Sequence, residues 1–179
     1  MNSNLTFNST FAGDVEEVKG GVYISRDGVN GSCKVIDPIV PPTPEIAINV
    51  TAPDWNLGEL PARNGEKVFS NSADQLCFSY SGAAVSGKNF IINASNVNGQ
   101  VNNRYRLRSV DDPTQEVPYD IKLDSGARLL NLPNIGNVDL TLDSSGKTCF
   151  VPTFRTTVNK MLKPGNYSDV LTFKVITRS

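Results

Sequence analysis

The sequence contains no histidine, and this absence removes several kinds of chemistry at once. Histidine is the general base of the Ser-His-Asp and Cys-His nucleophilic schemes and the commonest zinc ligand. The glycines do not lie in the strand–loop–helix context of a phosphate-binding loop. We therefore expect neither an enzyme nor a bound metal or other cofactor.

Net charge and long apolar runs are also lacking. Lys and Arg number 17 and Asp and Glu number 18, so the formal net charge is −1. This balance argues against a nucleic-acid binder or a membrane-surface binder. No apolar run approaches the roughly 18–20 residues that cross a bilayer. Met1 leads directly into polar residues without a signal-peptide pattern, and we expect the start of a mature chain.

Cysteine is scarce, and only Cys33, Cys77 and Cys149 are present. Their spacing contains no CxxC or other metal-ligand pattern. In an exported β-domain two of the three would pair and one would be left over. The spacing alone does not choose the pair.

Short segments with a period of two are abundant. Apolar and polar residues alternate over 46–50, 76–80, 104–108, 117–123 and 138–142, and short apolar runs occupy 89–93 and 148–151. Turn signals such as Asn98-Gly99 separate them. Short strands with regular turns and no helical periodicity predict an all-β sandwich.

The last segment is the most regular one. After a Pro-Gly turn and Tyr167, the apolar residues Leu171, Phe173 and Val175 alternate with polar ones. Such alternation places one apolar row on one face of a strand. Only two residues follow this strand, and an unpaired apolar edge is a liability. We therefore expect its missing neighbour to come from another chain.

The first twelve residues hold a further apolar pattern. Leu5, Phe7 and Phe11 share one face at strand spacing, with the small Ser9 between them. Two interpretations are open. The segment is an ordinary first strand, or it is a donor strand, an extended arm whose alternate side chains fill a groove on another subunit. A proline-rich stretch at 40–44 follows, and we expect a linker there because proline removes backbone donors.

A row of arginines is the candidate ligand face. Arg104, Arg106 and Arg108 alternate on one face of a predicted strand. Such a row would suit an acidic glycan or the carboxylates of a partner. The plainer interpretation is a solvated outer face, balanced by nearby acidic residues (Asp111, Asp112 and Glu116).

Trp55 and a group of carboxylates complete the candidates. An exposed Trp55 would stack on a sugar, whereas a buried one would fill the core, and we favour the core. Four aspartates lack the Asp-x-Asp-x-Asp-Gly spacing of a calcium loop and are interpreted as solvated turn residues: Asp111, Asp112, Asp120 and Asp124.

Two passages resemble a known family. Residues 72–82 are similar to the early strand of the pilin domain in tip adhesins of colonisation-factor-type (class 5-like) fimbriae. Residues 148–152 and 164–173 are similar to that domain's late cysteine and closing strand. The resemblance covers roughly residues 45–179, is one of pattern, and points to a subunit of a chaperone–usher pilus.

The resemblance implies an incomplete immunoglobulin-like β-sandwich that lacks its last strand and is completed by donor-strand complementation. In this family a periplasmic chaperone first supplies the strand. The N-terminal arm of the next subunit then replaces it at an outer-membrane usher. For this chain it implies residues 1–12 as the donor arm, 13–44 as first strands and linker, and 45–179 as the pilin-type domain.

Particular residues follow from the resemblance. The donor side chains would be Leu5, Phe7 and Phe11, and the acceptor-groove strand would present Tyr167, Leu171, Phe173 and Val175. The disulfide would join Cys77 to Cys149. The alternative, as in type 1-like pilins, joins Cys33 to Cys77.

We therefore expect a structural subunit of a bacterial surface fimbria, exported through the periplasm and polymerised with other pilus subunits. The first alternative is a receptor-binding fimbrial adhesin that attaches to a host glycan or protein receptor. The second is an exported immunoglobulin-like interaction domain with no polymerising role.

Overall fold

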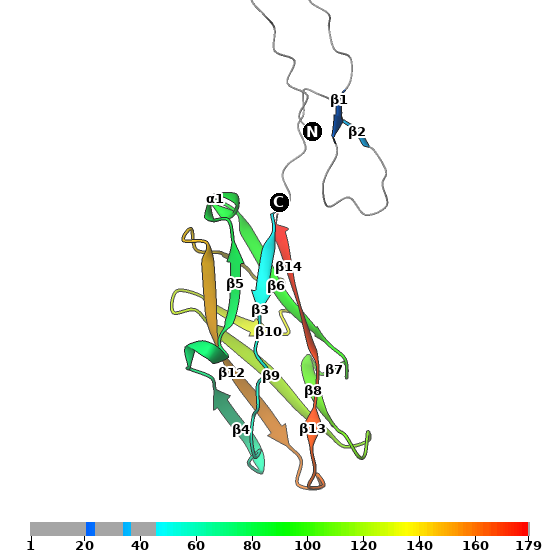
Figure 1. The fold of residues 1–179 in the computed structure, drawn as a ribbon. Helices are drawn as coiled ribbons and strands as arrows, with labels where there is room; N and C mark the ends of the chain where they lie inside the picture. Colours follow the sequence, from blue (N-terminus) through cyan, green and yellow to red (C-terminus); the bar gives the residue numbers. More distant parts are fainter. Residues whose placement is uncertain (1–20, 24–33, 37–45, 179) are drawn as a thin grey trace, which may run out of the picture. The chain divides into compact units, whose positions relative to one another are not determined.

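The structure is a computed structural model that describes residues 21–23, 34–36 and 46–178 (Figure 1). The chain divides into two units, residues 1–45 and 46–179. In the first unit, strand β1 (Gly21–Tyr23) pairs antiparallel with strand β2 (Lys34–Ile36). The two units are described separately below.

Several predicted features lie outside the described residues. These are the donor side chains Leu5, Phe7 and Phe11, the proline-rich linker, and Cys33. The donor-arm assignment and the linker therefore stay predictions.

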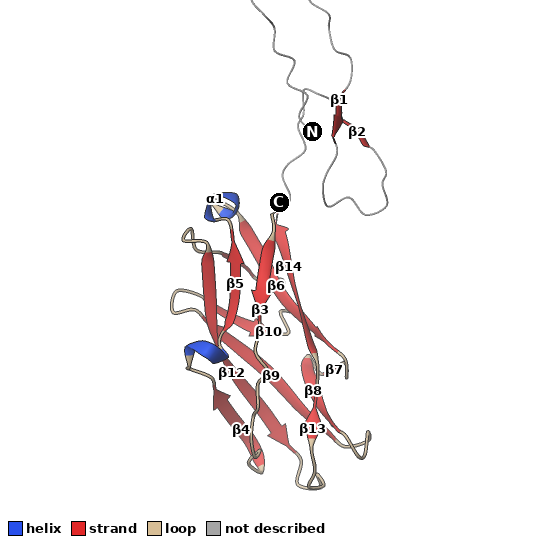
Figure 2. Ribbon diagram, viewed as in Figure 1, coloured by secondary structure: helices blue, strands red, loops and turns tan. Residues whose placement is uncertain are grey.

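The second unit consists of two β-sheets (Figures 1 and 2). In the nine-stranded sheet, the main path runs β13-β8-β9-β12-β5-β3, while β10 pairs with β9, β4 with β12 and β7 with β8. The three-stranded sheet runs β11-β6-β14. The strands of the larger sheet are β3 (Ile48–Thr51), β4 (Arg63–Val68), β5 (Leu76–Tyr80), β7 (Gln100–Val101), β8 (Arg104–Ser109), β9 (Glu116–Asp124), β10 (Leu129–Leu132), β12 (Lys147–Val158) and β13 (Tyr167–Ser168). Those of the smaller sheet are β6 (Asn89–Asn96), β11 (Asp139–Thr141) and β14 (Leu171–Arg178).

The all-β prediction is confirmed. Helix in the described part of the chain is limited to a 3-10 turn at Ser72–Asp74 and the single turn α1 (Gly82–Val85). Every strand pair is antiparallel. Antiparallel sheets commonly bury one face and expose the other, which agrees with the alternating sequence.

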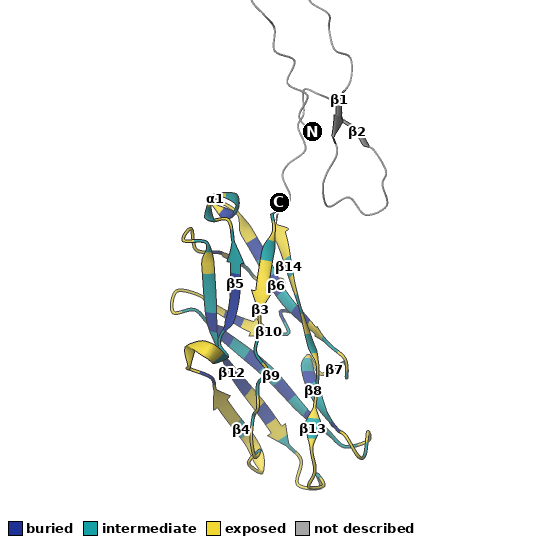
Figure 3. Cartoon of the chain, in the orientation of Figure 1, coloured by how far each residue is buried: buried dark blue, intermediate teal, exposed yellow. Residues whose placement is uncertain are grey.

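Alternation decides which side chains form the core. In β9, every second residue is buried, from Val117 to Leu123, and the residues between are half-buried (Figure 3). In β6, Phe90 and Ile92 are fully buried. The two sheets thereby enclose one apolar cluster, in which Phe78 and Phe150 meet edge to face at 5.9 Å. Burial of this apolar area is the main stabilising term of the unit.

The strand order matches part of the immunoglobulin fold. That fold has strands A, B, E and D in one sheet and C, F and G in the other. Here the order β3-β5-β12-β9 corresponds to A-B-E-D, and β6-β14 corresponds to C-F. No described strand lies beside β14 at the place of strand G. The larger sheet ends at β3 and the smaller one at β14, so both sheets end with an unpaired edge among the described strands.

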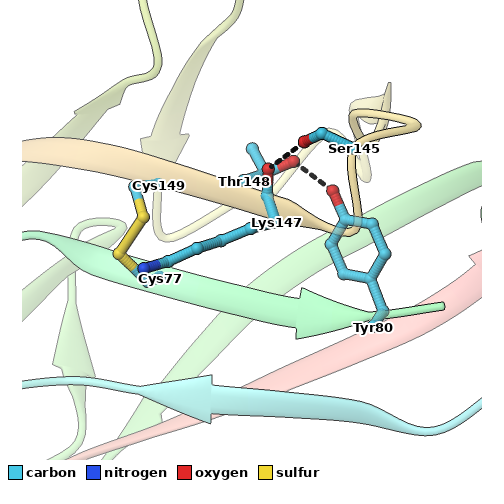
Figure 4. The surroundings of a disulfide bond; sticks show 6 residues. All are labelled: Cys77, Tyr80, Ser145, Lys147, Thr148 and Cys149. Atoms are coloured by element: carbon cyan, nitrogen blue, oxygen red, sulfur yellow. Dashed lines mark hydrogen bonds between the residues drawn. A yellow bond between two sulfur atoms is a disulfide. The ribbon is translucent and has the colours of Figure 1, made fainter. Parts of the chain in front are cut away.

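A disulfide joins strands β5 and β12 of the larger sheet (Figure 4). Cys77 and Cys149 lie directly opposite each other, with Cα atoms 4.1 Å apart. Beside them the Tyr80 hydroxyl and the Thr148 hydroxyl form a hydrogen bond across the same two strands. The structure therefore has the pairing that the family resemblance implied.

Candidate strand-acceptor groove

Strand β14 has one edge without a backbone partner among the described residues. Its other edge pairs with β6 along its whole length, from Leu171 opposite Asn96 to Arg178 opposite Asn89. Unpaired N–H and C=O groups on a strand edge are a template for another strand. In the immunoglobulin plan this position is an interior one with strand G on its other side, and no strand among the described residues occupies that place.

The inward side chains of β14 are incompletely covered. Leu171, Phe173 and Val175 pack against the core, yet each is only half-buried, and Figure 3 shows no buried residue along β14. By contrast, Phe90 and Ile92 on the adjacent β6 are fully buried. An apolar row that faces the core but stays accessible is expected where one strand of a sandwich is absent.

The segment 52–60, which follows β3, forms the opposite wall. Pro53, Trp55 and Leu57 are half-buried, while Asp54 and Asn56 are exposed. This is the alternation of a β-strand. Residues 54–60 nevertheless form no backbone ladder with other described residues. Both walls thus offer unpaired backbone to whatever lies between them.

Between the walls lies a groove of about 1180 Å³. Its walls are residues 52–60 and 162–171 with Phe173, and Leu107, Tyr119 and Phe154 line it from the larger sheet. The volume exceeds the ~300–1,000 Å³ of ordinary small-molecule sites. A smaller hollow of about 220 Å³ adjoins it and is lined by Leu57, Phe154 and Thr156 among others.

Trp55 spans part of this groove. Its indole N–H donates to the Asp74 carbonyl oxygen at 2.7 Å. Its ring lies 5.3 Å from that of Phe154 and 6.1 Å from that of Phe173, measured between centroids. One side chain from the 52–60 wall therefore touches β14 itself. The indole contributes to the aromatic core, in agreement with the interpretation favoured from the sequence.

A carboxylate fixes the start of β14. Asp169 accepts hydrogen bonds from the Tyr119 hydroxyl at 2.7 Å and from the Asn96 side-chain amide at 2.8 Å. It also accepts from the backbone N–H groups of Asn98 and Val170. These bonds tie the chain just before β14 to β6 and β9, so the groove wall is positioned by both sheets.

The side chains of two buried tyrosines, Tyr119 and Tyr105, interact with the Asp169 carboxylate. Burial, and then the hydrogen bond and charge of Asp169, raise the pKa of Tyr119 far above its ordinary value. Burial and the same charge also raise the pKa of Tyr105, whose hydroxyl donates to the Ala94 carbonyl oxygen at 2.8 Å. Both hydroxyls therefore stay protonated and act as donors over the ordinary pH range.

The predicted acceptor-strand residues fall on two strands rather than one. Leu171, Phe173 and Val175 lie on β14, and the first two line the groove. Tyr167 also lines the groove, but it belongs to β13, which pairs with β8 in the other sheet. The sequence pattern missed this division because only two residues, Asp169 and Val170, separate the two strands.

The arginine row of β8 is paired with carboxylates of β9. Arg104 lies 3.1 Å from Asp120, while Arg106 and Arg108 share Glu116 at 2.9 and 3.0 Å. Partial burial raises the pKa of Glu116, but hydrogen bonds from the two arginines outweigh it and leave that pKa below its ordinary value. The row thus has local partners, and they differ in part from those expected.

Asp112, one of the expected partners, pairs elsewhere. Its carboxylate accepts from the Lys163 ammonium at 2.9 Å and from the Thr114 hydroxyl at 2.6 Å. These hydrogen bonds, that of Thr114 first, lower the pKa of Asp112 to about 2. Asp112 therefore fastens the loop before β13 instead of balancing the arginines.

The described residues contain no cluster of His, Cys, Asp or Glu that could hold a metal ion. Among them there is also no helix long and apolar enough to cross a membrane. What the geometry offers is an apolar slot bordered by unpaired backbone. Such a slot suits an extended peptide better than a small substrate.

Within residues 46–178, the fold and the groove form an all-β sandwich in which no strand occupies the place of strand G. No family model matches the chain, and no curated protein matches it. Among solved structures, it is similar to a chain in the crystal structure of the CsuC–CsuE chaperone–tip adhesion subunit pre-assembly complex, from the archaic chaperone–usher Csu pili of Acinetobacter baumannii. The sequences are 16% identical and the TM-score is 0.41, with 73% of this chain and 39% of that chain covered.

Proposed function

We propose that this chain is a structural subunit of a bacterial surface pilus, and that its groove accepts a β-strand from another subunit. The observation that carries the proposal is the unpaired edge of β14 beside an apolar groove, at the place where the immunoglobulin plan has strand G. The sequence resemblance to pilin domains of chaperone–usher fimbriae supports it independently.

The physical gain from strand addition is large. An added strand pairs with the free edge of β14, and its inward side chains cover Leu171, Phe173 and Val175. Full burial of one large apolar side chain contributes roughly 1.5–3 kcal/mol. Three such side chains on the incoming strand therefore contribute about 5–9 kcal/mol, which is comparable with the whole stability of a domain.

A gain of that size has a consequence for assembly. A subunit with an empty groove exposes apolar surface and an open edge, both of which promote aggregation. It therefore needs a temporary strand before it meets its neighbour. In the proposed pathway a periplasmic chaperone supplies that strand, and an outer-membrane usher exchanges it for the arm of the next subunit at the cell surface.

The donor arm in this proposal is the segment of residues 1–12. Leu5, Phe7 and Phe11 provide the inward apolar side chains by their alternate spacing. An extended segment of seven residues is about 23 Å long. The eight-residue strand β14 is of similar length, so Leu5–Phe11 would cover most of its free edge.

Receptor binding through Arg104, Arg106 and Arg108 is the alternative function. Asp120 already pairs with Arg104. Both carboxylate oxygens of Glu116 accept from Arg106 Nη1 at 2.9 Å. An acidic ligand would have to compete with these carboxylates. The structural-subunit proposal does not need this face. Glycan binding lost in Arg106→Ala would favour the adhesin instead.

The test is a thermal melt of the full chain with and without a peptide of residues 3–15. To silence the chain's own arm, the acceptor carries Phe7→Ser and Phe11→Ser. A peptide at 100 times its Kd stabilises by about 2.7 kcal/mol, which corresponds to a rise in Tm of roughly 10 °C for a domain of this size.

The control peptide replaces Leu5, Phe7 and Phe11 by Ser and should leave the Tm unchanged. Size-exclusion chromatography of the chain with its native arm should show oligomers that the double Ser variant lacks. A stable monomer whose Tm ignores every peptide would contradict the proposal, because its sandwich would already be complete.

A further inference from the structure

Trp55 restricts which strand the groove can accept. Its indole reaches from the 52–60 wall to Phe173, with the two rings edge to face at 6.1 Å. Two rings at this distance are in van der Waals contact. No large side chain can therefore fit between them without displacing one ring.

Displacement of Trp55 is opposed on two sides. The indole N–H donates to the Asp74 carbonyl oxygen, so a rotated ring would break a hydrogen bond of 2.7 Å. The ring also packs on Phe154, which is 4% exposed and belongs to the central cluster. Phe173 is held in turn by the ladder between β14 and β6. The contact is thus a built feature of the groove.

The space that the groove offers to inward side chains of an added strand therefore differs from one residue of β14 to the next. A strand added to the free edge of β14 would place successive inward side chains near Leu171, Phe173 and Val175. At the two outer levels, Leu171 lines the groove and Val175 is half-buried. At the central level, the Trp55–Phe173 contact leaves room for a small side chain.

The N-terminal segment has a matching sequence. Positions 7, 9 and 11 read Phe, Ser, Phe, and alternate residues of an extended chain share one face. With Ser9 opposite Phe173, the two phenylalanines fall opposite Leu171 and Val175. The match holds for a parallel or an antiparallel arm, because the large–small–large pattern is symmetric.

Resting on the proposed function, we infer that Trp55 determines the register of strand acceptance, and that its occupant is the Leu5–Phe11 segment of a second copy of this chain with Ser9 facing the indole. A slip by two residues would force Phe7 or Phe11 against the Trp55–Phe173 contact. The contact thereby disfavours the two registers that lie two residues away from this one. Trp55 acts here as a specificity-determining residue.

The test compares three peptides of residues 3–15 on the full chain that carries Phe7→Ser and Phe11→Ser. Trp55 is the sole tryptophan of the chain, so its emission reports directly on the groove. The native peptide should bind and shift the emission. The Ser9→Leu peptide should bind at least tenfold more weakly. The matched control, an Asn8→Leu peptide, changes the outward face and should bind within about twofold of the native one.

The same peptides, carrying a fluorescent label, are then titrated into acceptors with Trp55→Ala. Removal of the indole should bring the Ser9→Leu peptide to within about twofold of the native peptide. Because Trp55→Ala removes core contacts, Trp55→Leu serves as a second acceptor, with a partial recovery expected. In the full chain with its native arm, Ser9→Leu should reduce the oligomeric fraction, and Trp55→Leu should partly restore it.

Equal binding of the Ser9→Leu and Asn8→Leu peptides to the native groove would overturn the inference while leaving strand acceptance intact. A Ser9→Leu penalty that persists in both Trp55 variants would also overturn it. A monomeric full chain with native sequence would exclude donation by a second copy. Failure of every peptide to bind would instead remove the proposed function itself.

Discussion

The Tyr119 hydroxyl is predicted to contribute more to stability than any other tyrosine hydroxyl of the groove region. Tyr119 is 2% exposed, and it donates to the Asp169 carboxylate at 2.7 Å. Hydrogen bonds to charged groups contribute roughly 1.5–3 kcal/mol, and loss of one partner leaves the other unsatisfied. We therefore expect Tyr119→Phe to lower the free energy of unfolding by about 2 kcal/mol.

Two other tyrosines calibrate this value. Tyr105 is fully buried but donates to a neutral carbonyl oxygen, that of Ala94, so Tyr105→Phe should lower the free energy of unfolding by about 1 kcal/mol. The Tyr167 hydroxyl donates to the Lys163 carbonyl oxygen in an exposed position. Water replaces that bond, and Tyr167→Phe should change stability by less than about 0.5 kcal/mol.

The assay is urea denaturation at neutral pH. It compares the arm-silenced full chain, which carries Phe7→Ser and Phe11→Ser, with its Tyr119→Phe, Tyr105→Phe and Tyr167→Phe variants. Parallel transitions with equal m-values would show that only stability differs. If Tyr119→Phe costs no more than Tyr167→Phe, the Asp169 carboxylate does not anchor β14, and the reasoning is refuted.

The pH dependence of the free energy of unfolding tests the role of the Tyr119 hydroxyl in a second way. The pKa of Tyr119 is raised in the folded state, so this group's contribution is fully present below the unfolded pKa of about 10. It is lost as pH rises beyond that value, because only the unfolded chain ionises there. Tyr119→Phe should therefore flatten the decline in stability above pH 10.

Two further predictions concern the sheets outside the groove. Replacement of Cys77 and Cys149 by Ala opens a bridge with a sequence separation of 72, and urea denaturation should show a loss of about 4 kcal/mol by the chain-entropy model; a loss below 1 kcal/mol would contradict it. Because the pKa of Glu116 is lowered, its stabilising effect is present above its ordinary value of 4.5 and lost as pH falls through the lower folded value. Glu116→Gln should thus lower stability by roughly 1–2 kcal/mol at pH 7, with a difference that shrinks as pH falls below 4.5 and through the lowered folded pKa, and a pH-independent difference would show that the arginine pairing is not its cause.

Much of the sandwich could be predicted from alternation alone. Wherever one face of a strand is buried, the sequence repeats with a period of two, as in β9 and β14. Strand β4 (Arg63–Val68) shows no such repeat, because almost all of its residues are exposed and it only borders β12. Strand β4 is held by backbone pairing with β12. Such pairing requires no apolar pattern in the sequence of β4 itself.

Because of Pro152, the length of β12 is underestimated from the sequence. The sequence predicts a strand over 148–151, and Pro152 argues against its continuation because proline cannot donate to a ladder. In the structure β12 runs on to Val158, between β4 and β9. The Pro152 carbonyl oxygen still accepts from the Phe69 N–H at 3.0 Å, so the strand uses the acceptor that proline keeps.

The groove itself could be predicted only in part. The apolar row of β14 is visible in the sequence, whereas its anchor Asp169 reads as an ordinary turn residue. Its partners Asn96 and Tyr119 lie 73 and 50 positions away. Trp55 likewise meets Phe173 across the fold, a contact that no local pattern encodes.

The most direct test of strand acceptance is hydrogen exchange of the β14 amides, Leu171–Arg178, in the arm-silenced full chain. Amides that bond to β6 should be protected at all times, and the alternate amides on the free edge should exchange rapidly. Addition of the peptide of residues 3–15 should slow exchange at those alternate amides, and the control peptide should not. Protection of both sets without any peptide, or no change on its addition, would contradict the account.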